Sequence, residues 1–312
     1  TWSPPRLAID PPAYVRAFDP CLWCDPDGRL WLFWAQAVGL WDGRAGVWAT
    51  RCDNPDVETP AWQAPRRLCD GIMMNKPLVL SNGEWLLPAA VWSWGSTLAK
   101  VNESLRLGLL PHEVAALSWP VADTYGSYVV ASVDGGRTWQ QRGRARLPQT
   151  NCDEHMVVER RDGSLWMLVR TAYGIGESVS IDGGRTWSPG GPSGIPHPVT
   201  RFFLRRLASG ALLMVRHAPA AGRRRSHLAA YVSDDDGRTW QGGLMLDERP
   251  DVSYPDGTQS GDGRIFLIYD HSRAGAREIL MAVFSEEDVR AGRCVSGSAR
   301  LRVVVNRAGK NA

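Results

Sequence analysis

One eight-residue pattern occurs three times in this chain of 312 residues. The copies read SVDGGRTW from Ser132, SIDGGRTW from Ser180 and SDDDGRTW from Ser233. In each copy the Asp side chain can accept hydrogen bonds from backbone N–H groups of its own turn, and Gly supplies a positive φ. The Ser and Thr hydroxyls can bond across the turn, and Trp offers a large apolar ring to a neighbouring element. The pattern therefore predicts a structural turn that closes a strand hairpin.

A second recurring element is a turn dipeptide that ends in Gly and precedes an apolar, β-rich run. Its five copies place this glycine at Gly28, Gly83, Gly163, Gly210 and Gly263. Each of these glycines follows a tryptophan, at Trp2, Trp62, Trp139, Trp187 and Trp240 respectively. The spacing is nearly constant, at 26, 21, 24, 23 and 23 residues. A unit of four short antiparallel strands that recurs at a fixed interval is typical of a β-propeller blade.

The number of hairpins predicts the number of blades. Five hairpins predict five blades, and Thr1-Trp2 has the form of the end of a preceding one. We therefore expect residues 1–312 to form a single all-β domain, a six-bladed propeller that lacks most of its first blade. The C-terminal run ARLRVVVN can supply a strand that closes the ring, or remain partly unpaired.

Residues 96–126 interrupt the regular spacing. The leucine spacing in this insertion predicts a short helix, which forms either the rim of a pocket or a plain surface insertion.

Composition excludes several classes of protein. A net charge of +3 with 44% hydrophobic residues predicts neither a nucleic-acid partner nor disorder. No apolar run reaches about 18 residues, so we expect no membrane span. The pair Cys21-x-x-Cys24 has no second metal-binding pair, which favours buried thiols over zinc, and no metal or other cofactor is expected. The sequence assigns no compartment, and secretion or a periplasmic location is compatible with it.

Polar residues at the ends of inner strands are the candidates for a functional site, because the inner strands of a propeller surround a central channel. Glu154 and Arg170 flank the hairpin at Asp162-Gly163, so hairpin geometry predicts that they lie together. Other candidates at strand ends, each of which could equally be a solvated charge or a satisfied histidine, are Lys76, Arg216, His217 and Asp270.

The octapeptide is the Asp-box, and three intact copies resemble the sialidase superfamily of six-bladed propellers. The resemblance implies that Glu154 and Arg170 belong to the active site. The segment RSHLAAYVSDDDGRTW resembles the family pattern that carries a carboxylate-binding arginine, which maps to Arg225 or, with a shifted register, to Arg223 or Arg224. The segment VSYPDG resembles the family's segment with the nucleophile, which maps to Tyr254.

These residue types suit the chemistry that the resemblance implies. A sialic acid carries a carboxylate on its anomeric carbon, so a neutral phenol avoids the repulsion that an anionic nucleophile would meet. Because a phenol with a pKa near 10 is weakly nucleophilic at neutral pH, a general base is needed, and Glu154 fits. Arginine fits a carboxylate because its planar guanidinium donates two parallel hydrogen bonds.

Two parts of the family pattern are missing. The Phe-Arg-Ile-Pro segment that supplies a further arginine has no match, and AFDPCLW carries Asp19-Pro20 in a similar context. The internal candidate for the acid is Asp42 in GLWDGRAG, although Asp-Gly is also a turn signal.

The sequence thus predicts a retaining, exo-acting hydrolase of a sialoside or another acidic glycan. The alternatives are a hydrolase of a different acidic sugar, a non-catalytic carbohydrate-binding propeller and a scaffold for protein partners.

Overall fold

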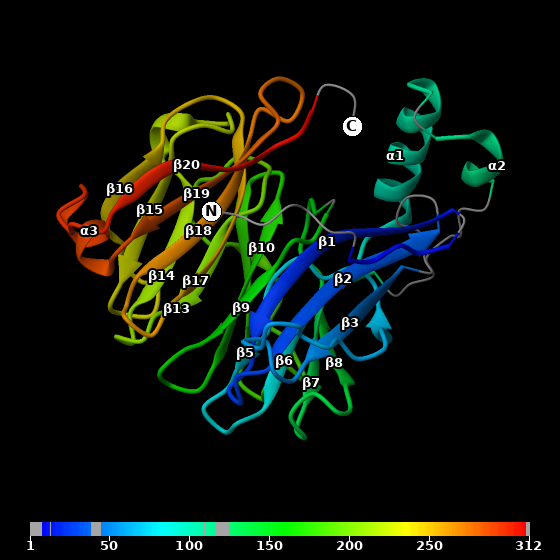
Figure 1. The fold of residues 1–312 in the computed structure, drawn as a ribbon, viewed down its shortest axis with the longest axis horizontal. Coiled ribbons are helices and arrows are strands. Elements are labelled where there is room, and N and C mark those ends of the chain that lie inside the picture. Colours follow the sequence, from blue (N-terminus) through cyan, green and yellow to red (C-terminus); the bar gives the residue numbers. More distant parts are fainter. Residues whose placement is uncertain are drawn as a thin grey trace.

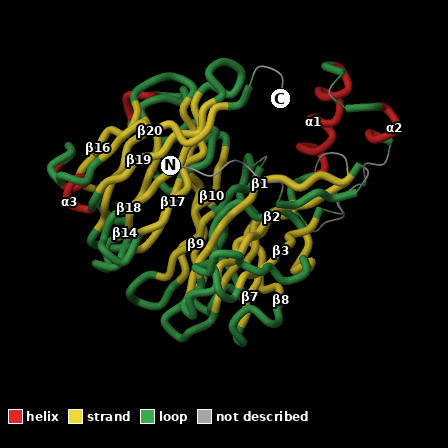
Figure 2. The backbone as a smooth tube through the Cα atoms, in the orientation of Figure 1, coloured by secondary structure: helices red, strands yellow, loops and turns green. Residues whose placement is uncertain are grey.

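Five antiparallel sheets of four strands each make up the fold (Figure 1). The computed structural model describes residues 8–12, 14–38, 45–108, 110–116, 125–150 and 152–309. Within every sheet the strands follow one another in chain order, so that each sheet is a meander with a first, inner strand and a fourth, outer strand. Figure 2 shows that helices are few beside the strands. The predicted all-β propeller is therefore confirmed.

The strands of the sheets have the following bounds. The first sheet contains β1 (Val15–Cys24), β2 (Leu30–Val38), β3 (Gly46–Cys52) and β4 (Arg66–Asp70). The second contains β5 (Leu78–Val79), β6 (Trp85–Val91), β7 (Gly126–Ser132) and β8 (Gln140–Ala145). The third contains β9 (Met156–Glu159), β10 (Leu165–Thr171), β11 (Gly174–Ser180) and β12 (Gly191–Pro192). The fourth contains β13 (Phe203–Arg206), β14 (Leu212–His217), β15 (Leu228–Ser233) and β16 (Gln241–Asp247). The fifth contains β17 (Val252–Gln259), β18 (Ile265–His271), β19 (Glu278–Phe284) and β20 (Arg300–Arg307).

The two recurring sequence elements occupy fixed places in the sheets. The five hairpin glycines join the first strand to the second and have φ between +80° and +87°, a region that favours glycine. The three Asp-boxes join the third strand to the fourth, at the outer edge of the second, third and fourth sheets. Both placements agree with the prediction from the repeats.

The hydrogen bonds of the Asp-box are local, as the copy at Ser180 illustrates. The buried Ser180 hydroxyl donates to Asp182 Oδ1 (2.8 Å) and accepts from the Gly184 N–H (2.8 Å). Asp182 also accepts from the Thr186 hydroxyl (2.6 Å) and N–H (2.8 Å). These hydrogen bonds lower the pKa of Asp182 to about 2, and the bond from the Thr186 hydroxyl has the largest effect. The motif is structural, as its chemistry predicts.

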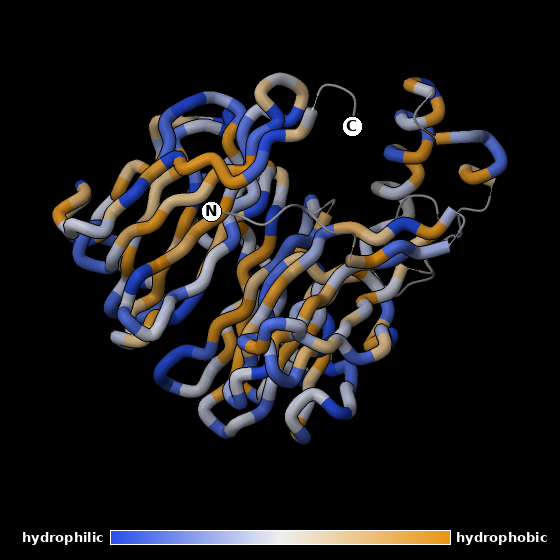
Figure 3. The backbone as a smooth tube through the Cα atoms, in the orientation of Figure 1, coloured by the Kyte–Doolittle hydropathy of each residue, from blue (hydrophilic) through white to orange (hydrophobic). Residues whose placement is uncertain are grey.

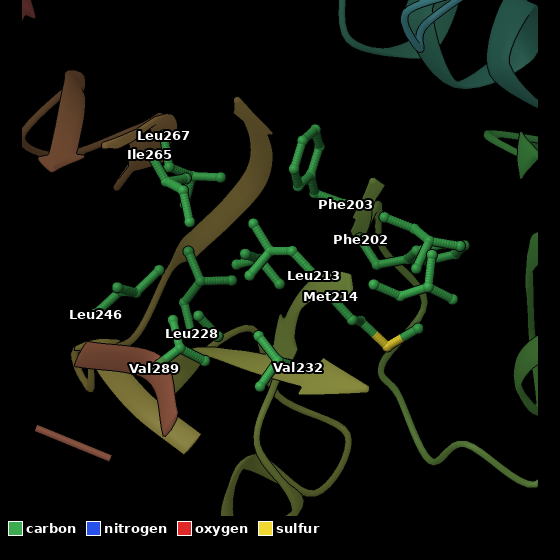
Figure 4. Packing of buried hydrophobic residues seen from close by; sticks show 14 of the residues in the cluster. Phe202, Phe203, Leu213, Met214, Leu228, Val232, Leu246, Ile265, Leu267 and Val289 are labelled. Atoms are coloured by element: carbon green, nitrogen blue, oxygen red, sulfur yellow. The ribbon is translucent and has the colours of Figure 1, made fainter. Parts of the chain in front are cut away.

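Apolar clusters join each sheet to its neighbours. One cluster is shared by the first and second sheets, another by the second and third, and the largest by the third, fourth and fifth. Figure 4 shows part of the largest cluster, with Phe203, Leu213 and Leu267 among its labelled residues. The Asp-box tryptophans Trp139, Trp187 and Trp240 pack against these clusters. In Figure 3 the hydrophobic colouring accordingly follows the strands.

The prediction of six blades is wrong for the part of the chain that the structure describes, which contains five sheets. Each glycine hairpin corresponds to one sheet, and Thr1-Trp2 lies outside the described residues. The run ARLRVVVN does not join another sheet; it forms β20, which pairs with β19 as the outer strand of the fifth sheet. In that sheet helix α3 (Glu286–Ala291) precedes the fourth strand, where other sheets have an Asp-box.

The insertion after β6 is helical, as predicted. It contains α1 (Trp94–Arg106) and α2 (His112–Ala115), which Figure 1 shows beyond one end of the first sheet. No helix in the described ranges is long and apolar enough to cross a bilayer.

The prediction of two buried thiols holds only for Cys21, because Cys24 is exposed. Residues three apart in a strand point to opposite faces, which explains the difference.

Candidate active site

A cavity of about 260 Å³ lies between the inner strand of the first sheet and the first two strands of the fifth. Its apolar wall includes Met74 and Ile268. Its polar lining residues are Asp19, Arg201, Tyr254, Asp270 and Arg273. Such a combination of apolar surface and a few convergent polar groups is typical of a small-molecule site.

Tyr254 reaches this cavity from a bulge in β17. The register of β17 against β18 shifts between Ser253 and Asp256, and Tyr254 adopts a φ of +58°. A non-glycine residue in this region is strained, and such strain persists where the surroundings fix it. The Tyr254 hydroxyl donates a hydrogen bond of 2.7 Å to Glu154 Oε1. Burial and the negative charge of Glu154 raise the pKa of Tyr254, so the phenol is protonated at rest.

Glu154 and Arg170 lie together, as the hairpin geometry predicts. Glu154 precedes β9 and is 2% exposed, and Arg170 lies near the end of β10. Arg170 Nη1 donates to Glu154 Oε1 (2.6 Å) and to the Tyr254 hydroxyl (3.1 Å). Burial is the largest effect on the pKa of Arg170 and lowers it, but Glu154, Tyr254 and Cys152 together outweigh burial, and the net shift is upward. The three side chains form one hydrogen-bonded group.

Two further arginines lie close to the ring of Tyr254. The guanidinium carbon of Arg273 is 4.2 Å from the ring centroid, and that of Arg225 is 5.8 Å away. Arg225 Nη2 donates to the Val199 carbonyl (3.0 Å). Arg223 and Arg224 are both exposed, whereas Arg225 is partly buried and lies over the ring of Tyr254.

Asp270 is a cavity residue with fixed partners. It accepts a hydrogen bond from the Ser253 hydroxyl (2.7 Å) and forms an ion pair with Arg273. Asp270 thereby fixes the position of Arg273 over the ring of Tyr254.

Lys76 belongs to a buried polar network next to the cavity. It forms an ion pair with Asp256, whose other oxygen accepts from Arg201 Nη2 (3.2 Å). Arg201 Nε donates to Asn75 Oδ1 (2.8 Å). Burial raises the pKa of Asp256, but the charges of Lys76 and Arg201 outweigh it and hold that pKa below its ordinary value.

Arg216 and His217 are not among the residues that line the cavity. Arg216 lies over the ring of Tyr231 at 4.5 Å, and a ring nitrogen of the buried His217 lies 2.7 Å from the Ser226 carbonyl. Burial lowers the pKa of His217 to about 4, so this histidine is neutral at physiological pH. Glu154, Arg170 and Arg225 do not line the cavity either, but they contact its wall residue Tyr254, whereas the contacts of Arg216 and His217 are with Tyr231 and the Ser226 carbonyl. Asp42 lies outside the described residues.

The sequence search did not select three residues of the site: Asp19, Arg201 and Asp256. Arg201 directly precedes the apolar run of β13, and Asp256 follows Tyr254 by two positions. The rule that selected Glu154, a polar residue at an inner strand, would also have found them. Among the described residues, no group of three or more His, Cys, Asp or Glu side chains is placed to hold a metal ion.

Solved structures with the same fold include sialidases. The Hadza microbial sialidase Hz136 matches with a TM-score of 0.65 and 18% identity, over 88% of this chain and 54% of its own. This chain thus spans about half the length of that protein. The intramolecular trans-sialidase from Ruminococcus gnavus, in complex with oseltamivir carboxylate, matches with a TM-score of 0.62 and 15% identity, over 88% of this chain and 79% of its own.

A protein of unknown function from Dyadobacter fermentans DSM 18053 matches with a TM-score of 0.59 and 16% identity, over 95% of this chain and 84% of its own. No sequence among the curated proteins matches the chain. At these identities the likeness to solved structures concerns the fold. The family model described as the BNR repeat-like domain matches residues 1–267, and the chain therefore belongs to the BNR repeat-like family.

Proposed function

We propose that the protein is a glycoside hydrolase that removes a terminal acidic sugar with retention of configuration. The observation that carries this proposal is the contact of Tyr254 with both Glu154 and Arg170 at the wall of a cavity. A phenol that is hydrogen-bonded to a buried carboxylate is a nucleophile paired with a base. An isolated strand tyrosine or a surface ion pair does not have this arrangement.

The proton of Tyr254 has a defined destination in this scheme. As the phenol oxygen attacks the anomeric carbon, its proton passes along the 2.7 Å hydrogen bond to Glu154. The raised pKa of Tyr254 makes this transfer necessary, because almost no phenolate is present without it. Arg170 contacts the same two oxygens and stabilises the negative charge that develops on the phenol oxygen during transfer.

An anionic substrate fits the cations around the cavity. Arg170 and Arg225 are proposed to bind the substrate carboxylate, with Arg201 and Arg273 adding positive charge at the cavity wall. Guanidinium groups remain charged at every relevant pH and donate paired hydrogen bonds to carboxylates. The substrate is therefore a sialoside or another acidic sugar, in line with the names of the sialidases that share the fold. Asp42 is the sequence-based candidate for the acid.

Hydrolysis of 4-methylumbelliferyl α-sialoside and the corresponding uronides by the full chain tests the proposal. We expect turnover that is lost in Tyr254→Phe and kept in Tyr14→Phe, a matched change at an exposed tyrosine. Equal turnover by Tyr254→Phe would refute the assigned nucleophile. If the wild-type protein binds these sugars in calorimetry but cleaves none of them, the function is carbohydrate binding instead.

A further inference from the structure

A second cavity, of about 460 Å³, lies at one end of β18, β19 and β20. These three strands are neighbours in the fifth sheet, as Figure 1 shows. The second cavity shares three lining residues, Asp270, Arg273 and Ile279, with the cavity that Tyr254 lines. Arg273 and Ile279 are exposed, so the two cavities adjoin at a boundary that faces solvent. A ligand bound at Tyr254 can therefore extend from the first cavity into the second.

The polar lining of the second cavity suits the hydroxyl groups of a neutral sugar. It includes two carboxylates, Asp270 and Glu278, and two guanidinium groups, Arg273 and Arg277, so the charges of these four side chains cancel. A hydroxyl group both donates and accepts hydrogen bonds, and it can use carboxylate and guanidinium partners at the same time. The amide of Asn306 adds a further donor and acceptor. An acidic sugar in this cavity would instead meet two carboxylates of like charge.

Glu278 is held by partners on both neighbouring strands. It is 7% exposed, and it pairs with His271 on β18 and with Arg307 on β20 in the strand ladders. A ring nitrogen of His271 lies 2.9 Å from Glu278 Oε2, and Arg307 forms an ion pair with Glu278 Oε1. A carboxylate that is already fixed in this way loses little side-chain freedom when it accepts a hydrogen bond from a ligand.

Arg277 is fixed in its backbone and still has donors to spare. It adopts a φ of +54°, its N–H donates to the Ser272 carbonyl (2.8 Å), and its carbonyl accepts from the Ala308 N–H (3.0 Å). The Nη1 atom of Arg277 donates to the Gly309 carbonyl (2.9 Å). No carboxylate within the described ranges forms an ion pair with Arg277, so its other N–H groups are available to a ligand.

We propose that the second cavity binds a neutral sugar to which the terminal acidic sugar is linked. The inference rests on the proposed function and names its substrate class, a glycan in which an acidic sugar caps a neutral one. Attack by Tyr254 requires the anomeric carbon beside its hydroxyl, so the next sugar lies one glycosidic bond away. The second cavity begins at that distance, because its lining residue Arg273 lies 4.2 Å from the centroid of the Tyr254 ring.

Two substrates with the same acidic sugar and an alkyl leaving group separate this role from the chemistry. Sialyllactose carries a neutral sugar next to the sialic acid, whereas methyl α-sialoside carries none. We expect Arg277→Met to lower kcat/KM for sialyllactose by about 10- to 100-fold, mainly through KM, and to change the value for methyl α-sialoside by less than about 2-fold. Arg293→Met, at an exposed arginine after α3, is the matched control and should leave both values unchanged.

A second variant guards against a folding defect in Arg277→Met. Asn306 is exposed, and Asn306→Ala should lower kcat/KM for sialyllactose by about 3- to 10-fold while that for methyl α-sialoside is kept. An equal loss on both substrates in either folded variant would overturn the inference, because the cavity would then hold part of the acidic sugar itself. Unchanged kinetics of both variants on sialyllactose would overturn it as well.

The wild-type protein tests the predicted neutrality of the second sugar. We expect a higher kcat/KM for sialyllactose than for a disialoside, in which the second sugar is also acidic, and the reverse order would overturn the inference. If the protein cleaves uronides in place of sialosides, the corresponding methyl and lactosyl uronides replace these probes. Absence of cleavage of any acidic glycoside, methyl and aryl glycosides included, would instead overturn the proposed function, and the inference with it.

Discussion

The hydroxyl of Tyr254 lies 2.7 Å from Glu154 Oε1, although 100 positions separate the two residues in the chain. Tyr254 comes from the fifth sheet and Glu154 from the start of the third. The contact therefore depends on the arrangement of the sheets around their common centre. Because the two residues have different proposed roles, replacement of each should have a different measurable effect.

Replacement of Glu154 by Gln should remove the base and keep the shape of the side chain. We expect kcat to fall by about 10²- to 10⁴-fold on both aryl and alkyl substrates, because every substrate requires deprotonation of Tyr254. Steady-state kinetics on sialyllactose and the aryl sialoside would measure the effect. Glu58→Gln, at an exposed glutamate, is the control, and a leaving-group dependence in Glu154→Gln would contradict its role as the base.

Replacement of Asp19 by Asn should change the pH dependence of stability. Burial, with the charge of Glu154, raises the folded-state pKa of Asp19 from its ordinary value of 3.8 to about 6. Below pH 3.8 the residue is protonated in both states, and as the pH rises through 6 the folded protein loses up to about 3 kcal/mol. Asp19→Asn should therefore be more stable than the wild type at pH 7.5, with little difference at pH 4. Urea unfolding at the two pH values would measure this, and a constant difference would contradict the raised pKa.

Loss of the Asp-box serine should lower the stability of the protein. Ser180→Ala leaves the buried Gly184 N–H without its acceptor, so we expect a loss of about 1 to 3 kcal/mol in the free energy of unfolding. Turnover should be kept, because the box lies at the outer edge of its sheet. Ser209→Ala, in an exposed turn, is the control. Equal stability of the two variants would show that the hydrogen bonds of the box contribute little.

The ion-pair network next to the cavity should respond to a double-mutant cycle. Asp256→Asn leaves the buried cations Lys76 and Arg201 without their carboxylate, which should cost about 3 kcal/mol or more. Adding Lys76→Met should restore about 1 to 2 kcal/mol, because one unpaired charge is then removed. Denaturant unfolding of the four proteins would measure the coupling. Simple additivity of the two changes would contradict the pairing.

Local patterns in the sequence predicted most of the fold. The glycine hairpins and Asp-boxes each depend on a few adjacent residues, so their positions between the strands could be inferred. The five glycine hairpins correspond to the five sheets that the structure describes, whereas the sixth blade of the prediction depended on Thr1-Trp2, which lies outside the described residues. Helix α3 was not foreseen, because neither of the two repeated elements covers residues 286–291.

Sequence patterns and the family resemblance predicted part of the site. The proximity of Glu154 and Arg170 followed from hairpin geometry, and the residues around Tyr254 were assigned by resemblance. Asp19 meets the rule that selected Glu154, a polar residue at an inner strand, but its access to the cavity depends on a bulge and a left-handed backbone in β1, which the strand pattern does not show. Arg216 and His217 have a similar position at a strand end, and only their packing partners distinguish them from cavity residues.

The cavity has walls from β1 and from β17, the first and last of the inner strands. Catalysis by this protein would therefore require that the first and the fifth sheets lie against each other. Two fragments produced by a cut between β12 and β13 would each hold one of the walls, and mixing them would regenerate turnover only if they reassociate.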